Sequence, residues 1–229
     1  AQHFDGRLIN CMSCTSECAY LAAGSVLMRT SDDFFPQRPE SHGLHLHANA
    51  QAGVWFGEFM LPDWDMFQSS HERGEFHAAA RAISGGPVYV SDKPGLHDAA
   101  LLRKLVLSDG SVLRAEHPAR PTPDNLFADP TREPVLLKVF NSHRDAAVVG
   151  LFNAHHGSPD GGRIEGTVAP CDVPTLAAGG HAAYAQRADR VWRCAFDQTT
   201  AFALAQGEWE LVSFAPVEHG FAALGLADK

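Results

Sequence analysis

The chain lacks three features that would each have pointed to a particular class of protein. It has no apolar run of about 18 residues, so no segment is long enough for a membrane-spanning helix. It has no cluster of lysine or arginine, and its formal net charge of −9 at pH 7 argues against a nucleic-acid partner. It also contains no internal repeat. We therefore expect a globular protein with neither a membrane nor a nucleic acid as its partner.

The start of the chain and its cysteines bear on its compartment. The first residues, AQHFDGRLIN, contain no initiator methionine and none of the basic and apolar regions of a signal peptide. We expect no signal peptide, and we expect the chain to be a piece of something longer. The five cysteines are an odd number, which without a secretory signal favours reduced thiols. The expected location is cytoplasmic.

Two groups of residues raise the question of a metal. The segment CMSCTSEC gives Cys11, Cys14 and Cys18 a C-x2-C-x3-C spacing, but no second Cys or His pair follows at zinc-finger spacing. A zinc protein is therefore the weakest hypothesis. His42 and His45 lie three residues apart on an expected helix and could meet a metal. Surface and capping histidines on an amphipathic helix are the preferred interpretation, and we expect no metal.

Short apolar runs alternate with helical patterns up to residue 107. Strands are expected at RLINC, SVLM, VWFGEFM and GGPVYVSD, and helices at Glu17–Ala23, Pro39–Ala52, His71–Ile83 and Asp98–Leu107. Alternation of this kind predicts a parallel sheet with crossover helices. Four such units make half of an eight-unit β/α barrel.

The pattern changes at Ser108. From there to residue 229, turns rich in Gly, Pro and Asp separate short apolar or β-branched runs about ten residues apart, which is typical of an antiparallel sandwich or barrel. The runs are SVLR, PVLLKVF, AAVVGLF, RIEGTV, HAAYAQR, RVWRCAF, TAFALA and WELVSFAPV. The Pro-rich stretch PARPTPDNLFADPTREP is expected to be a connector. The predicted fold is α/β over residues 1–107 followed by an all-β domain over 108–229.

Carboxylates gather where the second expected strand ends. The sequence MRTSDDF places Arg29, Asp32 and Asp33 on one loop, and a paired carboxylate can act as a general acid if its pKa is raised towards neutrality. An alternative is that Ser31, Asp32 and Asp33 cap the following helix, because Ser and Asp are favoured there. Spacing alone leaves the two interpretations about equal.

A second acidic loop, PDWD, follows the third expected strand. Trp64 could stack on the apolar face of a sugar while Asp63 and Asp65 accept bonds from its hydroxyl groups. The loops after parallel strands converge on one face of a barrel, so Asp92, after the fourth strand, and Cys11, after the first, are expected at the same pocket. The alternatives are a Trp that plugs the barrel, aspartates that cap a helix and a cysteine that is a small buried hydrophobe. An acidic pocket with a tryptophan suggests a carbohydrate ligand.

The sequence resembles the raffinose synthase family, which includes seed imbibition proteins and alkaline α-galactosidases. The resemblance rests on INCMS, MRTSDDF, SHGLHLHANA, FGEFMLPDWDMF, AARAISGGPVYVSDKPG, LLRKLVLSDGSVLRA, RPTPDNLFADPTR and EWELVSFAPV, and it runs in order through nearly the whole chain. It implies an eight-fold β/α barrel with a C-terminal antiparallel β-domain. This agrees with the pattern described above.

The resemblance also implies a chemistry. Family members are retaining enzymes that act on α-galactosides, with a nucleophilic Asp in a K-x-D motif and an acid/base Asp in R-x-x-x-D. The second motif matches Arg29 to Asp33, which makes Asp33 the acid/base, with Asp32 as the fallback. Cys11, Arg29, Asp32, Asp63, Trp64, Asp65 and Asp92 are then expected to bind the substrate. No cofactor is implied, because carboxylates carry both steps.

One motif of the family is absent. No K-x-D occurs upstream of Cys11, and the resemblance places the start of the chain near the fifth strand of the barrel. The missing N-terminal half is expected in the same chain or in a partner chain, and the 229 residues are expected to be inactive alone. The acceptor could be water or sucrose. The rival hypothesis is a non-catalytic carbohydrate-binding or assembly module.

Overall fold

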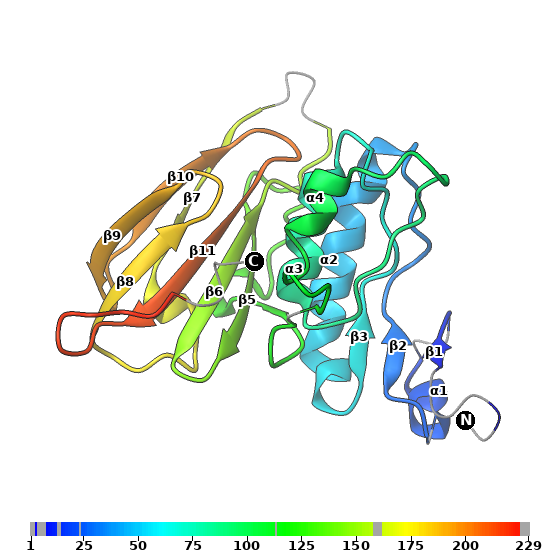
Figure 1. Cartoon of the computed structure of the whole chain (residues 1–229), viewed down its shortest axis with the longest axis horizontal. Coiled ribbons are helices and arrows are strands. Elements are labelled where there is room, and N and C mark those ends of the chain that lie inside the picture. Colours follow the sequence, from blue (N-terminus) through cyan, green and yellow to red (C-terminus); the bar gives the residue numbers. More distant parts are fainter. Residues whose placement is uncertain are drawn as a thin grey trace.

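The structure, a computed structural model, describes residues 3, 8–12, 15–22, 24–112, 114–157 and 162–224. Its main helices lie between two kinds of sheet (Figure 1). A small parallel sheet from the first part of the chain lies on one side of the helices. Antiparallel strands from the second part lie on the other side. The mixed fold thus changes from parallel to antiparallel pairing along the sequence.

The parallel sheet has the strand order β1-β2-β3, with short strands. These are β1 Ile9–Asn10, β2 Leu27–Arg29 and β3 Leu61–Asp63, with helix α1 Ser16–Leu21 between the first two and α2 Pro39–Trp55 between the last two. A fourth strand was expected around Val90. The described residues show only a parallel bridge between Phe67 and Val90 at that point. The barrel half therefore stays a prediction.

The third strand was expected in the wrong place. Within the run VWFGEFM, Val54 and Trp55 continue helix α2 and Phe56–Glu58 form the 3-10 helix η1. The strand begins only at Leu61. A short apolar run has no periodicity that separates a strand from a helix end, and here Val54 and Trp55 are exposed on the outside of the helix.

The remaining helices begin and end at recognisable signals. Pro39 occupies the first turn of α2, where its missing N–H costs nothing. Helix α3, Gly74–Ser84, ends at Gly85, whose φ of 75° lies in the left-handed region that glycine tolerates. Helix α4, Ala99–Arg103, is capped by Asp98, which accepts hydrogen bonds from the N–H groups of Ala100 and Leu101. No helix among the described residues is both long and apolar enough to cross a membrane.

The antiparallel strands form a six-stranded and a two-stranded sheet. The six-stranded sheet has the order β4-β5-β6-β11-β8-β9, and β7 pairs with β10. Their bounds are β4 Arg120–Pro121, β5 Leu137–His143, β6 Ala146–Phe152, β7 Ile164–Val168, β8 Gly180–Ala185, β9 Arg190–Ala195, β10 Thr200–Leu204 and β11 Trp209–Pro216, with 3-10 helices η2 Pro123–Asn125 and η3 Pro170–Asp172. Seven expected strands are therefore present, and the Pro-rich connector contributes β4 and η2.

The expected strand SVLR is absent from the part of it that the structure describes, because residues 111, 112 and 114 form no strand and residue 113 lies outside the described residues. Turn residues Asp109 and Gly110 lead directly into this segment, and Asp109 accepts hydrogen bonds from the N–H and the hydroxyl of Ser111. Such local bonds favour a turn over a strand. The boundary between residues 107 and 108 stays a prediction.

The six-stranded sheet has a core on each face. Side chains on one face, such as Val139 and Phe152, pack with helices α2 and α3. Side chains on the opposite face, such as Leu151 and Phe214, pack with β7 and β10. Alternate residues of a strand point to opposite faces, so Leu151 and Phe152 enter different cores.

Asn141 of β5 joins the helices to the sheet. Its Nδ2 donates hydrogen bonds to the carbonyl groups of Ile83, at the end of α3, and His117, and its Oδ1 accepts one from the N–H of His117. The side chain is buried. Three polar groups of the segments around Ile83 and His117 thus depend on one amide of the sheet.

Candidate active site

The centre of the site is Arg29, the last residue of β2. Its Nη2 is 2.7 Å from Asp33 Oδ1, and its Nη1 is 3.0 Å from Asp65 Oδ2. The side chains of Arg29 and Asp65 are only 6% and 2% exposed, whereas that of Asp33 is 54% exposed. A buried guanidinium therefore joins a buried carboxylate to one that faces solvent.

Arg29 remains a cation in this setting. Burial works against its charged form, but the nearby charges of Asp65, Cys11 and Asp33 outweigh burial and hold the pKa of Arg29 above its ordinary value. Cys11 follows β1 directly, is exposed, and lies close enough to Arg29 to act on it electrostatically. The ends of β1 and β2 thus share one electrostatic environment, and a substrate-binding role for Cys11 stays a prediction.

Asp65 is fixed by the residues around it. Its Oδ2 also accepts a hydrogen bond from the N–H of Phe34, its N–H donates to Asp63 Oδ1, and its φ of 63° lies in the left-handed region. The hydroxyl of Tyr89 donates to Asp63 Oδ2 at 2.7 Å and lies 3.5 Å from Asp65 Oδ1. Burial raises the pKa of Asp63 despite these bonds, and burial and Asp63 raise that of Tyr89. Asp63 and Asp65 are therefore both enclosed, and the expectation that they contact a sugar directly is corrected.

Arg81 of α3 holds the loop that carries Asp65. It donates to the carbonyl groups of Trp64 at 2.6 Å, Asp65 at 3.3 Å and Met66 at 3.2 Å. The side chain is fully buried, and burial lowers its pKa to about 10. Three successive backbone acceptors fix the shape of the loop between β3 and α3.

The expected surface histidines are buried beside Arg81. His42 Nδ1 is 2.7 Å from His77 Nε2, and His77 Nδ1 is 2.8 Å from Arg81 Nη1. His45 Nε2 is 2.8 Å from the carbonyl of Trp64. Burial lowers the pKa of His42 to about 4 and that of His45 to about 3, and it also lowers that of His77 well below its ordinary value. The surface interpretation of His42 and His45 is wrong because the whole helix face is covered by the loop after β2 and by α3.

The two groups of residues that raised the question of a metal are not arranged as a metal site in the described residues. Among the described residues, no group of three His, Cys, Asp or Glu side chains is arranged to hold a metal ion. Cys14 of the CMSCTSEC cluster lies outside the described residues, and Cys18 is exposed. The histidines bond to each other, to Arg81 or to backbone carbonyl groups.

Trp64 does not face the acidic residues. Its side chain is 0% exposed and belongs to the core between the helices and the six-stranded sheet. A sugar cannot stack on a ring with no exposed face, so the expected aromatic platform is corrected. The place of Trp64 beside the six-stranded sheet is not the barrel plug of the alternative either. In the loop PDWD, the neighbours of Trp64 turn towards Arg29 and Tyr89 while Trp64 turns towards Leu46 and Phe76.

Asp92 serves to join two loops. Its side chain is buried and accepts hydrogen bonds from the N–H and hydroxyl of Ser69, and it lies 3.2 Å from His97 Nδ1. Burial works against its charged form, but the bonds from Ser69 and His97 hold its pKa below the ordinary value. The expected contact of Asp92 with substrate is corrected to this structural role. Asp32, by contrast, is exposed.

The sequence did not predict Tyr89, Arg81 and His77 as part of the site. Two of them, Tyr89 and Arg81, had a weak signal. Tyr89 alternates with Val88 and Val90 in an expected strand, and Arg81 is the single charged residue in the Ala-rich run HAAARAIS. A charged residue on an apolar helix face is rarely buried unless it has partners, which is the signal that could have identified Arg81.

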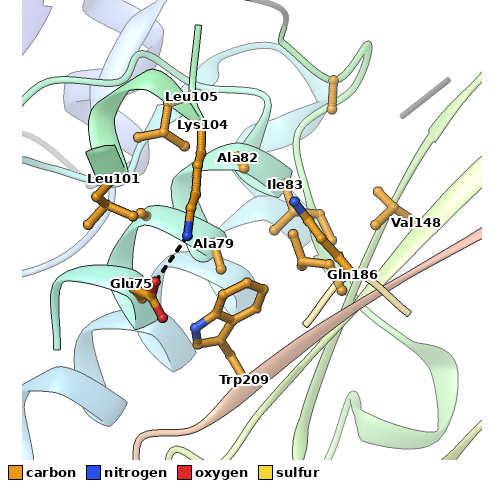
Figure 2. A pocket seen from close by; sticks show the side chains of 13 residues that line it. Glu75, Ala79, Ala82, Ile83, Leu101, Lys104, Leu105, Val148, Gln186 and Trp209 are labelled. Carbon is orange, nitrogen blue, oxygen red and sulfur yellow. Dashed lines mark hydrogen bonds and ion pairs between the residues drawn. The ribbon is translucent and has the colours of Figure 1, made fainter. Parts of the chain in front are cut away.

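A cavity elsewhere in the molecule has a different, mostly apolar lining. Figure 2 shows it between helices α3 and α4 and the antiparallel strands, with Trp209 on one side and the ion pair between Glu75 and Lys104, 3.1 Å apart, on another. Most of its lining is apolar, including Ala79, Ile83, Leu101 and Val148. The cavity offers packing but not the paired carboxylates of the strand ends, so the candidate active site is the cluster around Arg29.

The family model and the curated relatives that match this chain indicate the same protein family. A family model described as raffinose synthase or seed imbibition protein Sip1 matches residues 1–228. The chain is 40% identical over 253 aligned residues to a probable galactinol–sucrose galactosyltransferase of Arabidopsis thaliana, covering 98% of the chain and 34% of that protein. It is 36% identical to a galactinol–sucrose galactosyltransferase of Oryza sativa subsp. japonica, covering 99% of the chain and 34% of that protein. The chain thus spans about a third of the length of these curated relatives.

Among solved structures, a family GH27 β-L-arabinopyranosidase from Geobacillus stearothermophilus has a similar fold. The TM-score is 0.64 at 16% sequence identity, and the match covers 90% of the chain and 48% of that structure. At this identity the likeness concerns the fold alone.

Proposed function

Because the chain belongs to the family of raffinose synthases and seed imbibition proteins, we propose that it is part of a retaining enzyme that transfers galactosyl groups from an α-galactoside. The observation that carries the proposal is the exposed carboxylate of Asp33 on the buried guanidinium of Arg29, 2.7 Å away. We further propose that β1, β2 and β3 belong to half of a (β/α)8 barrel and that the antiparallel sheets form a sandwich. The similar fold of the glycosidase structure supports this arrangement.

Asp33 would act twice in the reaction. In the first step its proton passes to the glycosidic oxygen as the bond to the anomeric carbon breaks and a carboxylate nucleophile attacks that carbon. In the second step Asp33 takes the proton of the acceptor hydroxyl, whose oxygen displaces the nucleophile. Water as acceptor gives hydrolysis, and sucrose as acceptor gives galactosyl transfer. Asp32 is the fallback for this role, but the contact of Asp33 with Arg29 supports Asp33.

The nucleophile is proposed to come from elsewhere. No K-x-D motif occurs in the 229 residues. We propose that it lies in the other half of the barrel, in the same chain or in a partner chain. A substrate such as a raffinose-family oligosaccharide or galactinol is consistent with the names of the relatives, and a cytoplasmic location remains part of the proposal. The rival proposal is a carbohydrate-binding or assembly module without catalysis.

The test is Asp33→Asn in a polypeptide that joins this chain to the K-x-D half of a barrel. With raffinose as donor we expect a loss of about 10²–10⁴-fold in rate, the usual contribution of a general acid/base group. An aryl α-galactoside with a good leaving group needs little protonation, so its first step should lose much less. Added azide needs no deprotonation and should then yield α-galactosyl azide, because two inversions retain the configuration.

The matched control is Asp32→Asn, one residue away and also exposed. It should be mild, because Asp32 is exposed and does not cap α2, whose N-cap is Arg38. A larger loss of activity in Asp32→Asn than in Asp33→Asn would move the acid/base to Asp32. The isolated chain is expected to show no turnover, and robust turnover by it would overturn the mechanism. Sugar binding without turnover in every longer polypeptide would establish the binding module instead.

A further inference from the structure

One guanidinium serves two carboxylates in this site. Arg29 contacts the exposed Asp33 and the buried Asp65 at 2.7 and 3.0 Å. A general acid must hold a proton when the reaction begins, whereas an adjacent cation favours the loss of that proton. An arginine bonded to Asp33 alone would therefore work against the acid role.

We propose that Asp65 is a positioning residue that shares the Arg29 cation with Asp33 and so reduces the positive charge that acts on Asp33. The inference rests on the proposed function, because it takes Asp33 as the acid/base. Two effects act in the same direction. Asp65 neutralises part of the charge of Arg29, and its own negative charge disfavours a second carboxylate nearby. Both oppose the effect of Arg29, which favours loss of the Asp33 proton.

The structure leaves Asp65 little freedom to do anything else. Its Oδ2 accepts from both Arg29 and the N–H of Phe34, and its backbone carbonyl accepts from Arg81. With a side chain that is 2% exposed, it cannot also serve a sugar hydroxyl in solvent. The positive φ of 63° directs the carboxylate back towards β2, so the loop geometry and the ion pair depend on each other.

Two groups near the pair keep one charge state through the pH range of the test. Burial and Arg81 keep the pKa of His45 at about 3, and burial leaves that of Arg81 at about 10, so neither changes charge between about pH 5 and 8. Burial raises the pKa values of Tyr89 and Asp63. Among the described residues, six titratable groups face Arg29, Asp65 or their loop. Cys11 and Asp33 follow β1 and β2, and Asp63 ends β3. The other three are His45 on α2, Arg81 on α3 and Tyr89.

The test measures the pH profile of kcat/KM for raffinose in the joined polypeptide. Its basic limb is the fall in kcat/KM at high pH, where the general acid loses its proton. In Asp65→Asn the full charge of Arg29 falls on Asp33, so the limb should move to lower pH by about one unit, within the range typical of an aspartate beside an arginine. Asn tolerates the left-handed region, as does Gly, so Asp65→Gly should show the same shift. Asp65→Glu restores the charge and should return the limb towards its original position.

Two further variants control the result. Asp92→Asn removes another buried carboxylate, one that contacts Ser69 and His97 rather than Arg29, and should leave the limb in place. Arg29→Gln should move the limb to higher pH, because the cation that favours loss of the Asp33 proton is gone and Asp65 stays nearby as an anion. An unmoved limb in this variant overturns the inference even if neither neutral variant at position 65 folds.

An unmoved limb in Asp65→Asn and Asp65→Gly, or in Arg29→Gln, would overturn the inference, even if activity falls. An equal shift in Asp92→Asn would also overturn it. The two proposals fail separately. Without α-galactosyl azide from either Asp33→Asn or Asp32→Asn, the proposed function itself fails. If the azide product forms and the limb does not move, only the charge sharing is wrong.

Discussion

The two sides of the molecule bury different kinds of groups. Around the ends of β2 and β3 the buried side chains include Arg29, Asp63, Asp65, His77 and Arg81. The core between the six-stranded sheet and the β7–β10 pair is built instead from aliphatic and aromatic side chains. Strands are two or three residues long on the first side and mostly five to eight on the second.

The comparison distinguishes the interactions that orient side chains from those that stabilise the fold. Burial of apolar area is favourable but has no preferred direction. Hydrogen bonds and ion pairs have a direction, but their net contribution is small, and an unpaired buried charge is costly. The ion pairs of the polar side can therefore fix the direction of side chains such as Arg29 and Asp65, while apolar burial in the cores supports the fold around them.

The largest effect should come from the apolar side. Phe214→Ala in β11 removes a ring that is 1% exposed, and we expect the free energy of unfolding to fall by about 3–5 kcal/mol. Urea denaturation measures it, with Phe127→Ala as the control because Phe127 is 95% exposed. Similar losses in both variants would contradict the division between the two sides.

The buried histidines of the polar side should make the stability of the protein depend on pH. His42 is neutral in the folded protein, with a pKa of about 4, whereas an unfolded histidine titrates near its ordinary 6.5. As the pH falls from about 6.5 to 4, the unfolded chain binds a proton that the folded chain does not, so stability is lost in that window. At about 1.4 kcal/mol per pKa unit, His42 contributes roughly 3 kcal/mol to this loss.

His42→Gln should therefore make the denaturation midpoint less dependent on pH between 6.5 and 4, although the variant is less stable at pH 7 because His77 loses a partner. His219→Gln changes an exposed histidine and should leave the pH dependence as it was. An unchanged slope in His42→Gln would show that His42 is not a source of acid sensitivity.

The smallest effect is expected at the edge of the cavity in Figure 2. Lys104 and Glu75 form an ion pair there, and both side chains are more than half exposed, at 58% and 56%. A double-mutant cycle with Lys104→Ala and Glu75→Ala should give a coupling of about 0.5 kcal/mol or less, because solvent screens the pair. A coupling of several kcal/mol would mean that this edge is enclosed as the strand-end cluster is.

The sequence predicted the antiparallel strands better than the parallel ones. Runs such as AAVVGLF and WELVSFAPV are long and bounded by turn residues, and they became β6 and β11. In VWFGEFM the apolar residues belong partly to a helix end, and no local rule distinguishes that outcome. Short parallel strands such as Leu61–Asp63 exist because tertiary packing places them beside β2, which periodicity does not reveal.

For the site, the motif R-x-x-x-D gave the pair of Arg29 and Asp33, but not the direction of the side chains in PDWD. Trp64 lies in the core, and Asp65 faces Arg29, because the positive φ at Asp65 and the bonds from Arg81 turn the loop. These depend on α3, which comes later in the chain. The side-chain directions in PDWD therefore could not be predicted from the loop sequence alone.

Asn141 has a consequence for how the molecule can be divided. Its amide bonds to the carbonyl groups of Ile83 and His117, so a cut near residue 108 would expose both the amide and the sheet face that packs on α2 and α3. The helices and the six-stranded sheet are therefore expected to melt in a single transition, and neither half is expected to be recovered intact after proteolysis between them. A swap of this β-domain between relatives would need to carry the end of α3 and the segment up to residue 117 with it.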